Sequence, residues 1–523
     1  MQAMIRRLLP ALLSLPFVTV AFAASPDSSE QAAVSSRFEA LRTNPQEFPL
    51  FMRAFPKGAD LHNHLVGAIY AEHLLEWAKQ DQLCVNPDTG AIGPTRCAFG
   101  FHTSKDAIPA AQIMQDQALY TQTIDALSMR NFVPSPQDRS GHDHFFATFD
   151  KFLPATAAHD ADMLVDALSQ AARDHVTYVE LMVSPQLNAV ARLGSSYRIN
   201  RESDIAQAEI RVVPHLNHLV KLAREETDSM ERKARATMKC GTKEALPGCH
   251  VAVRYLYQTI RTMPPGMVLA QIAFGYTLAT ADSRFVGINI VGPEDNPIAM
   301  QDYTLHMQMF HTLSERWPKV KLSLHAGELS PGLVAPSGLD NHIRQAVEIA
   351  GASRIGHGVD IMQEHDPYGL LAEMAQRNIL VEINLSSNEQ ILNIKDNAHP
   401  FVTYRSHGVP VALSTDDEGV SRITLTDEYL RAAKTYALSY TDLKDLSRMG
   451  LEHGFVAGKS LWDSTKPFHR APACADIDAR EAEPEGLCRE LLAHSQKARL
   501  EWDLENQFNQ FEHQVVTGQP FQN

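Results

Sequence analysis

Eight short apolar segments, each separated from the next by a longer helical pattern, constrain the fold of this chain most strongly. They are rich in β-branched and aliphatic residues, and turn residues or polar clusters bound them. Strands that alternate with helices predict a parallel sheet, and eight of them predict a (β/α)8 TIM barrel. The predicted strands are residues 59–64, 175–184, 250–260, 284–291, 320–326, 353–357, 379–385 and 409–415.

The rest of the chain is expected to form additions to this barrel. The first two predicted strands lie too far apart for a single crossover connection, so we expect an insertion after the first strand. A charged stretch at residues 222–249 is expected to be irregular. The predicted parts are an export signal at 1–23, an N-terminal helical extension at 24–56, the barrel at 57–470 with its insertion over about 80–145, and a C-terminal helical tail at 471–523.

The first residues have the layout of a secretory signal. Arg6 and Arg7 precede an apolar run that begins at Leu8, and the small-residue motif AFA at 21–23 precedes Ala24. The run is shorter than the roughly 20 residues that a membrane span needs, and prolines interrupt it, so cleavage is favoured over an uncleaved anchor. We therefore expect a periplasmic or secreted protein that has no membrane attachment once the signal is removed.

Composition excludes one class of partner. The chain carries 47 Lys and Arg residues against 62 Asp and Glu residues, which gives a net charge of −15. Such an acidic chain is a poor ligand for a phosphate backbone, so no nucleic-acid partner is expected. Hydrophobic residues make up 44% of the chain and charged residues 21%, a balance that predicts a globular protein with a large core.

The six cysteines fall into three close pairs, which in an exported protein favours three local disulfides. A metal cluster is disfavoured because no pair has the C-x-x-C spacing. Free buried thiols are the remaining alternative. The predicted pairs are Cys84 with Cys97, Cys240 with Cys249, and Cys474 with Cys488.

Polar residues lie where several predicted strands end, and a TIM barrel keeps its active site at that end. His62 and His64 are two residues apart on the first strand, so both imidazoles point to one face, the barrel interior. Two converging imidazoles suit a zinc-type ion. The fifth strand ends in His325 and Glu328, and Gly327 between them lets the backbone approach a ligand closely.

Two more strands end in the same way, with His357 between two glycines and with the pair Asp416 and Asp417. Taken singly, His357 could be a satisfied core histidine and either aspartate a helix N-cap. Taken together, four strand ends would have to collect costly polar groups without a use. We expect three histidines and one aspartate to bind an ion that lowers the pKa of a water molecule, while Glu328, His357 and Asp417 serve the remaining proton chemistry.

The motifs that carry these residues resemble, in order and spacing, those of the adenosine deaminase family. They are FPKGADLHNHLVGAIYAEHL, NIVGPED, LHAGE, RIGHG, NLSSN and LSTDDEGV, and the resemblance covers residues 55–465. The export signal, the long lead-in and the disulfide-bearing insertion resemble the secreted adenosine deaminase-related growth factor branch of that family. The branch resemblance is compatible with a homodimer formed through the lead-in.

The resemblance implies hydrolytic deamination of adenosine and 2′-deoxyadenosine, with release of ammonia and, from adenosine, inosine. It implies one zinc ion per chain, bound by His62, His64, His325 and Asp416. The other implied roles are proton donation to purine N1 by Glu328, orientation and deprotonation of the water by His357, a hydrogen bond to N7 from Asp417, and one to N3 from the backbone of Gly292.

Some positions leave the substrate and the pocket open. Val66 stands where the cytosolic enzymes of the family have an acidic residue that contacts ribose, so the exact nucleoside is open. The alternatives are a modified or phosphorylated adenine compound, or a secreted partner-binding or signalling protein on the same barrel. Asn388 is a pocket residue or an ordinary turn residue. His142 and His144 in the insertion favour a polar loop over the pocket rather than a second metal site.

Overall fold

The computed structural model describes residues 26–97, 107–136, 138–481 and 483–519, so the predicted export signal lies outside the described residues. Eight parallel strands form one sheet in the order β1-β5-β6-β7-β8-β9-β10-β11. Every predicted strand overlaps an observed one. The strands are β1 (Gly58–His64), β5 (Val176–Val183), β6 (Ala252–Ile260), β7 (Phe285–Val291), β8 (Lys321–Ala326), β9 (Arg354–His357), β10 (Leu380–Ile383) and β11 (Val411–Leu413).

The sheet closes into a barrel where the chain after β11 meets β1. The N–H of Asp416 donates to the carbonyl of His62 over 2.8 Å, and the N–H of His64 donates to the carbonyl of Asp416 over 3.2 Å. Asn63 and Asp416 form the resulting parallel bridge. Closure removes the unpaired edges that an open sheet would expose. The predicted (β/α)8 TIM barrel is confirmed.

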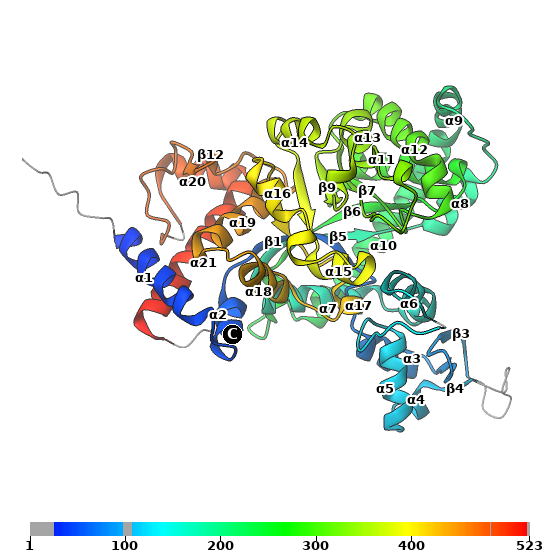
Figure 1. The fold of residues 1–523 in the computed structure, drawn as a ribbon, viewed down its shortest axis with the longest axis horizontal. Coiled ribbons are helices and arrows are strands. Elements are labelled where there is room, and N and C mark those ends of the chain that lie inside the picture. Colours follow the sequence, from blue (N-terminus) through cyan, green and yellow to red (C-terminus); the bar gives the residue numbers. More distant parts are fainter. Residues whose placement is uncertain (1–25, 98–106, 137, 482, 520–523) are drawn as a thin grey trace, which may run out of the picture.

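Helices surround the barrel (Figure 1). They are α7 (Asp160–Arg173), α8 (Leu187–Gly194), α9 (Ile205–Val212), α10 (Leu216–Thr237), α11 (Pro265–Ala281), α12 (Pro297–Arg316), α13 (His342–Gln345), α14 (Pro367–Gln376), α15 (Leu385–Leu392), α16 (Phe401–Ser406), α17 (Glu418–Ser421), α18 (Leu425–Thr435) and α19 (Tyr440–His453). Helix α11 is apolar on nearly all sides because it packs against β6, β7, α8 and α12 at once.

The expectation that residues 222–249 are irregular is wrong over most of its length. Helix α10 continues to Thr237, and only the turn that holds Cys240 and Cys249 is irregular. The helix buries small or apolar side chains such as Val220, Ala223 and Thr227, which recur at helical spacing. Its charged residues therefore form the solvent face of an amphipathic helix and do not indicate a loop.

The insertion after β1 forms a small unit beside the barrel (Figure 1). Its three-stranded sheet has the order β3-β2-β4, and the disulfide between Cys84 and Cys97 ties β2 to the end of β3. The elements of this part of the chain are α3 (Ala71–Gln80), β2 (Leu83–Val85), β3 (Ile92–Arg96), β4 (Ile108–Pro109), α4 (Ala110–Ile113), α5 (Gln117–Ala126) and α6 (Gly141–Thr156).

The N-terminal extension and the C-terminal tail pack against each other. The extension forms α1 (Pro26–Leu41) and α2 (Glu47–Ala54). A hairpin of β12 (Trp462–Thr465) and β13 (Phe468–Arg470) precedes the tail, which forms α20 (Gly486–His494) and α21 (Gln496–Thr517). Ring centroids lie 5.0 Å apart for Phe51 and Phe511, and 5.6 Å apart for Phe55 and Phe508. The two ends of the chain therefore share one aromatic core.

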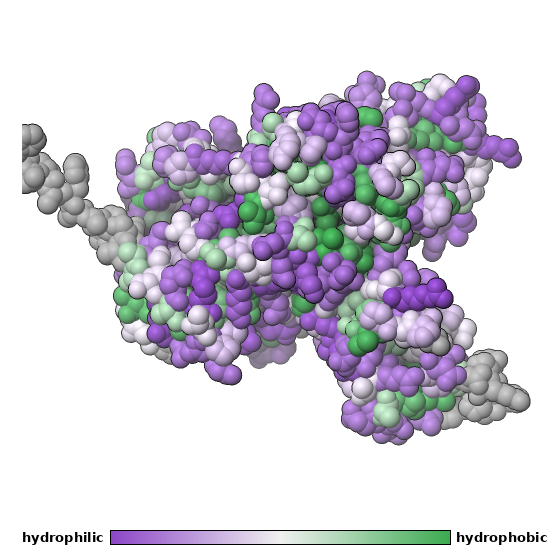
Figure 2. Space-filling view, viewed as in Figure 1, coloured by the Kyte–Doolittle hydropathy of each residue, from purple (hydrophilic) through white to green (hydrophobic). Residues whose placement is uncertain are grey.

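The three predicted disulfides are confirmed, and together they account for all six cysteines. None of the described helices has the length and apolar character needed to cross a membrane. The face of the molecule in Figure 2 is mostly hydrophilic and carries only small, separate hydrophobic areas.

Replacing Phe508 with Ala should destabilise the protein, because it removes a fully buried ring from the core shared by α21 and the extension. We expect a loss of about 3–5 kcal/mol in the free energy of unfolding, measured by urea denaturation. Leu487→Ala on α20 is the control, since this side chain is 69% exposed. Its effect should stay within about 0.5 kcal/mol. Equal losses in both variants would contradict the shared core.

Candidate active site

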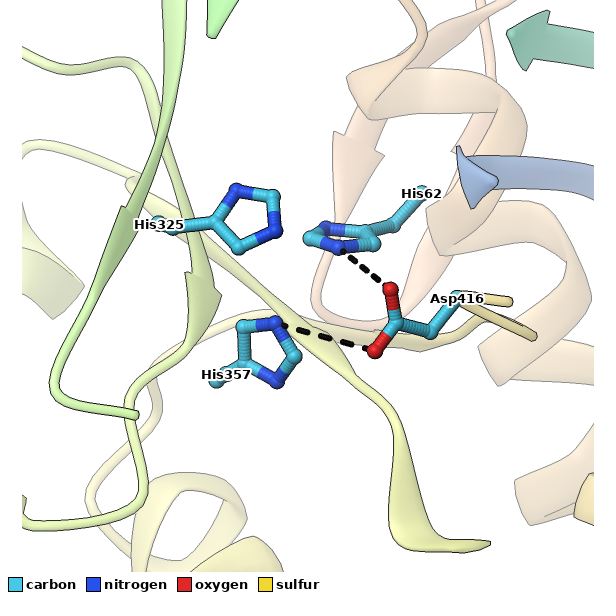
Figure 3. Close-up of side chains that lie close together, drawn as sticks. All are labelled: His62, His325, His357 and Asp416. Atoms are coloured by element: carbon cyan, nitrogen blue, oxygen red, sulfur yellow. Dashed lines mark ion pairs between the residues drawn. The ribbon is translucent and has the colours of Figure 1, made fainter. Parts of the chain in front are cut away.

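Four buried side chains from four parts of the barrel converge at the C-terminal ends of the strands. His62 comes from β1, His325 from β8 and His357 from β9, and Asp416 follows β11. Figure 3 shows their side chains turned toward one another. Each offers one ligand atom, and these atoms all lie within 4.8 Å of one another. The arrangement could therefore hold a metal ion.

His64 joins the same cluster from the end of β1. Its Nε2 lies 3.3 Å from Asp416 Oδ1 and 3.3 Å from His325 Nε2, and His62 Nε2 lies 3.4 Å from Asp416 Oδ1. The structure thus brings together all four residues that the resemblance implies as zinc ligands. His357 is more peripheral, because its Nε2 is 3.9 Å from the nearest oxygen of Asp416.

Each of the three histidines implied as ligands is oriented by an oxygen at its other ring nitrogen. The Nδ1 of His62 lies 2.7 Å from Glu382 Oε2, and the Nδ1 of His64 lies 2.9 Å from Gln258 Oε1. The Nδ1 of His325 lies 2.8 Å from Asn289 Oδ1. An oxygen acceptor places the ring proton on Nδ1, so the lone pair of Nε2 faces the cluster. The Nε2 of His62 is buried and has no hydrogen-bond partner among the described residues, as expected of a ligand atom.

These three orienting residues were not predicted from the sequence. Each is a polar residue on a barrel strand: Gln258 on β6, Asn289 on β7 and Glu382 on β10, the last two being the single polar residue of an otherwise apolar strand. A lone polar side chain in a buried strand is costly without a partner, and that cost is the signal that could have found them. Which histidine each one contacts depends on the strand register, which the sequence does not show.

Glu382 is itself held by a buried arginine. The Arg354 guanidinium hydrogen-bonds both Glu382 and Glu180, and all three side chains are inaccessible to solvent. Burial alone would raise the pKa of Glu382, but the charge of Arg354 and the hydrogen bond with His62 hold it at about 2. Glu382 therefore stays ionised at neutral pH and accepts a hydrogen bond from the Nδ1–H of His62.

The carboxylate of Glu294 fixes the backbone at Glu328 through hydrogen bonds. The backbone N–H groups of Gly327 and Glu328 donate to the two carboxylate oxygens of Glu294 over 3.0 and 2.9 Å. Gly327 has φ +73°, and a Cβ there would come within 2.4 Å of Asp360. Burial, reinforced by the charges of Asp416 and Glu294, raises the pKa of Glu328 well above its usual value. The surroundings of Glu328 therefore favour the protonated, neutral form of its carboxyl.

His357 and Asp417 complete the polar wall of the site. Burial lowers the pKa of His357 to about 3, so its ring is neutral, and burial raises the pKa of Asp417 to about 8, so its carboxyl carries a proton at neutral pH. His357 Nδ1 lies 3.5 Å from Glu328 Oε1 and 2.9 Å from Asn388 Nδ2. Its Nε2 has no hydrogen-bond partner among the described residues.

Asn388 is not the turn residue that the sequence allowed. It lies on α15, is fully buried, and is a neighbour of His357 that does not line the cavity. The Nε2–H of His399 donates to Asn388 Oδ1 over 3.0 Å, which directs the Asn388 amide nitrogen toward His357. Asn388 therefore supports His357 and does not border the cavity directly.

His64, His325, His357 and Asp416 of the cluster line a cavity of about 660 Å³. Gly292, Glu328 and Asp417 line the same cavity, together with apolar side chains such as Phe145 and Phe146. Gly292 has φ +97°, a conformation that favours glycine. The acidic residues Asp150, Asp160 and Glu226 also line the cavity, and no Lys or Arg is among the described lining residues.

His142 and His144 do not lie on a loop, contrary to expectation. Both are in the first turn of α6, which Ser140 caps by accepting a hydrogen bond from the N–H of Asp143. His144 packs inward against Asp138 and the carbonyl of Ser128, and His142 Nε2 lies 3.0 Å from Asp295 Oδ1. Neither belongs to a group that could hold a metal among the described residues. The histidines anchor the helix that carries the apolar wall of the cavity.

Comparison with known proteins identifies the family to which this chain belongs. A model of the adenosine deaminase family matches residues 111–461. This chain belongs to the adenosine deaminase family. An adenosine deaminase of Enterococcus faecalis is 24% identical over 338 residues, which cover 64% of this chain and 83% of the relative. One of Clostridium perfringens is 32% identical over 138 residues, 26% of this chain, so the chain spans only 38% of that relative.

Among solved structures, the ADAL–IMP complex superposes with a TM-score of 0.51 at 19% sequence identity, over 78% of this chain and 94% of that one. This similarity shows a common fold. The family match begins after β1, so His62 and His64 lie outside it. The folded barrel brings these two residues next to the other site residues. The assignment to the growth factor branch stays a prediction.

Removing an orienting oxygen should weaken metal binding while all four implied ligands remain. Asn289→Ala deletes the contact that holds His325, and we expect metal affinity to fall about 10–100-fold, measured by competition with a chelator. Asn296→Ala is the control, because Asn296 lines the cavity but contacts no histidine of the cluster. An unchanged affinity in Asn289→Ala would contradict this orienting role.

Proposed function

We propose that the chain is an exported, zinc-dependent adenosine deaminase that converts adenosine and 2′-deoxyadenosine to the corresponding inosine nucleosides and ammonia. The observation that carries this proposal is the convergence of the His and Asp cluster with Glu328 and Asp417 at one cavity. Membership of the adenosine deaminase family supports the same chemistry.

His62, His64, His325 and Asp416 are the residues that would hold the metal. Three imidazole nitrogens and one carboxylate are a donor set that suits zinc, and the buried Nε2 of His62, which makes no hydrogen bond to a described residue, fits a ligand atom. Bound there, zinc would act as a Lewis acid that lowers the pKa of a water molecule toward neutrality.

The side chains around the cluster would then carry the proton transfers. Glu328 would give its proton to purine N1, while the Nε2–H of the neutral His357 ring orients the water whose oxygen adds to C6. The Glu328 carboxylate would take a proton from that water and pass it to the amino nitrogen, the bond between C6 and this nitrogen would break, and ammonia would leave. The second water proton would then restore the acid form of Glu328.

Two further groups would position the purine. The protonated carboxyl of Asp417 can donate a hydrogen bond to N7, and the backbone N–H of Gly292 can donate to N3, since both residues line the cavity near the cluster. The apolar wall formed by Phe145 and Phe146 would exclude water from the face of the base. Val66 also lines the cavity, and its aliphatic side chain offers no hydrogen bond to ribose.

The charge of the cavity favours a nucleoside over a nucleotide. The acidic side chains Asp150, Asp160 and Glu226 line the cavity together with the site residues. A phosphate group would meet repulsion there, with no described Lys or Arg of the lining to bind it. The phosphorylated adenine compound that the sequence left open is therefore the weaker alternative. A pure partner-binding role is also weaker, because it would not need Glu328 and His357.

The disulfides support the export part of the proposal. All three form in an oxidising compartment far more readily than in the cytosol. Together with the signal layout of the first residues, they favour a periplasmic or secreted enzyme.

Glu328→Gln should abolish most activity without loss of metal. The amide keeps the size of the side chain but cannot donate an acidic proton, so we expect kcat for adenosine to fall about 10²–10⁴-fold. Elemental analysis should find the metal content of wild type. Glu225→Gln, at an exposed position on α10, should keep full activity. If Glu328→Gln deaminated adenosine at the wild-type rate, the assigned proton donor would be wrong.

AMP should be a poor substrate compared with adenosine. Repulsion between its phosphate and the acidic lining should lower kcat/KM roughly 100-fold or more relative to adenosine, measured by ammonia release at matched ionic strength. High salt should narrow the difference, because it screens the exposed charges. Equal or faster turnover of AMP would favour the phosphorylated-substrate alternative.

A further inference from the structure

A second cavity, of about 270 Å³, lies at the opposite end of the barrel from the His and Asp cluster. We call it the basal cavity. Its walls come from the beginnings of β8, β9 and β10, the end of α19 and the beginning of α21. The N-terminal end of a TIM barrel does not carry the active site, so this cavity is separate from the proposed catalytic chemistry.

The lining of the basal cavity is strongly basic, although the chain has a net charge of −15. The cations are Lys321, Arg354, Arg377 and Lys497, and Glu452 is the acidic residue among the described lining residues. The carboxylate of Glu452 accepts a hydrogen bond from the Ser460 hydroxyl over 2.6 Å. Positive charge therefore exceeds negative charge around the cavity.

Two of the four cations lack a carboxylate partner. Arg354 is neutralised by Glu180 and Glu382, and Arg377 pairs with Glu373 over 2.6 Å. The Lys321 ammonium lies 5.0 Å from the ring centroid of Phe455 and makes no ion pair with a described residue.

Lys497 donates to the backbone carbonyl of Glu452 and likewise pairs with no described carboxylate. Two lysine ammonium groups at one small cavity therefore have no described carboxylate partner.

Uncharged polar groups at the basal cavity also lack partners. The hydroxyl of the half-buried Ser353 and the side-chain amide of the exposed Asn378 make no hydrogen bond to a described residue. The Nε2 of His453 is a buried atom without a hydrogen-bond partner among the described residues. Burial, together with the charges of Lys497 and Arg354, lowers the pKa of His453 to about 3. Its ring is neutral, and it can still donate one hydrogen bond. Such groups are normally satisfied by protein, water or a ligand.

We propose that the basal cavity binds a small oxyanion with at least two negative charges, of which phosphate is the representative. Lys321 and Lys497 would supply the charge, and the Ser353 hydroxyl and the Asn378 amide would donate hydrogen bonds to the oxygens. Because Lys497 begins α21 and Lys321 begins β8, the anion would tie the C-terminal tail to the barrel. This site is independent of the proposed deaminase activity.

The test is a calorimetric titration of the full-length mature protein with inorganic phosphate, against sodium chloride at matched ionic strength. We expect saturable binding of one phosphate per chain. Lys321→Met should weaken it about tenfold or more, the loss expected for one charge-assisted hydrogen bond. Lys319→Met is the matched control, since Lys319 is an exposed lysine two residues away that does not line the cavity. It should bind phosphate as wild type does.

A parallel titration with glycerol 3-phosphate distinguishes a free oxyanion from a phosphate ester as the ligand. A site for the free ion should bind glycerol 3-phosphate with lower affinity than inorganic phosphate. Ser353→Ala, which removes a hydroxyl assigned to the anion, is a second variant in case Lys321→Met folds poorly, which circular dichroism would reveal, and it should also weaken phosphate binding. Absence of saturable binding would overturn the proposal, and so would equal affinities of the Lys321→Met and Lys319→Met proteins. Deamination of adenosine does not enter either readout.

Discussion

The closure of the barrel at Asp416 is the constraint on which the rest of the site depends. Its backbone hydrogen-bonds to His62 on one side and His64 on the other, which joins the end of the last strand to the end of the first. The same contact sets the Asp416 carboxylate beside both imidazoles, at 3.4 and 3.3 Å. Barrel closure and assembly of the proposed metal site are therefore one structural event.

The sequence predicted the barrel and the residues at its strand ends because both depend on local patterns. Buried parallel strands need runs of apolar residues, and polar residues such as His357 stand out at their ends. Close spacing of the cysteines also predicted the three disulfides. The many charged residues of α10 led to the wrong expectation of irregular structure. The segment forms a helix because its buried side chains recur at helical spacing.

The parts that the sequence could not predict depend on register and on long-range packing. Gln258, Asn289 and Glu382 are ordinary polar residues until the strands are paired, when each one meets the Nδ1 of a different histidine. Asn388 likewise acquires its contact with His357 only when the fold brings α15 to the end of β9. These contacts fix the tautomers of the histidines, so the chemistry of the site depends on pairings that no single segment encodes.

A buried ionic network links the two ends of the barrel. Arg354 borders the basal cavity and also holds Glu382, which in turn orients His62 in the cluster. Ion pairs of this kind are costly to desolvate and are retained when they fix a specific arrangement. Here the arrangement is the direction in which the Nε2 of His62 points.

The most direct test of the central claim is the release of ammonia from adenosine by the purified protein, before chelation, after chelation, and after zinc is returned. Steady turnover that disappears with the metal and returns with zinc is the predicted result. Turnover that survives complete metal removal, or no turnover by protein with zinc bound, would contradict the account.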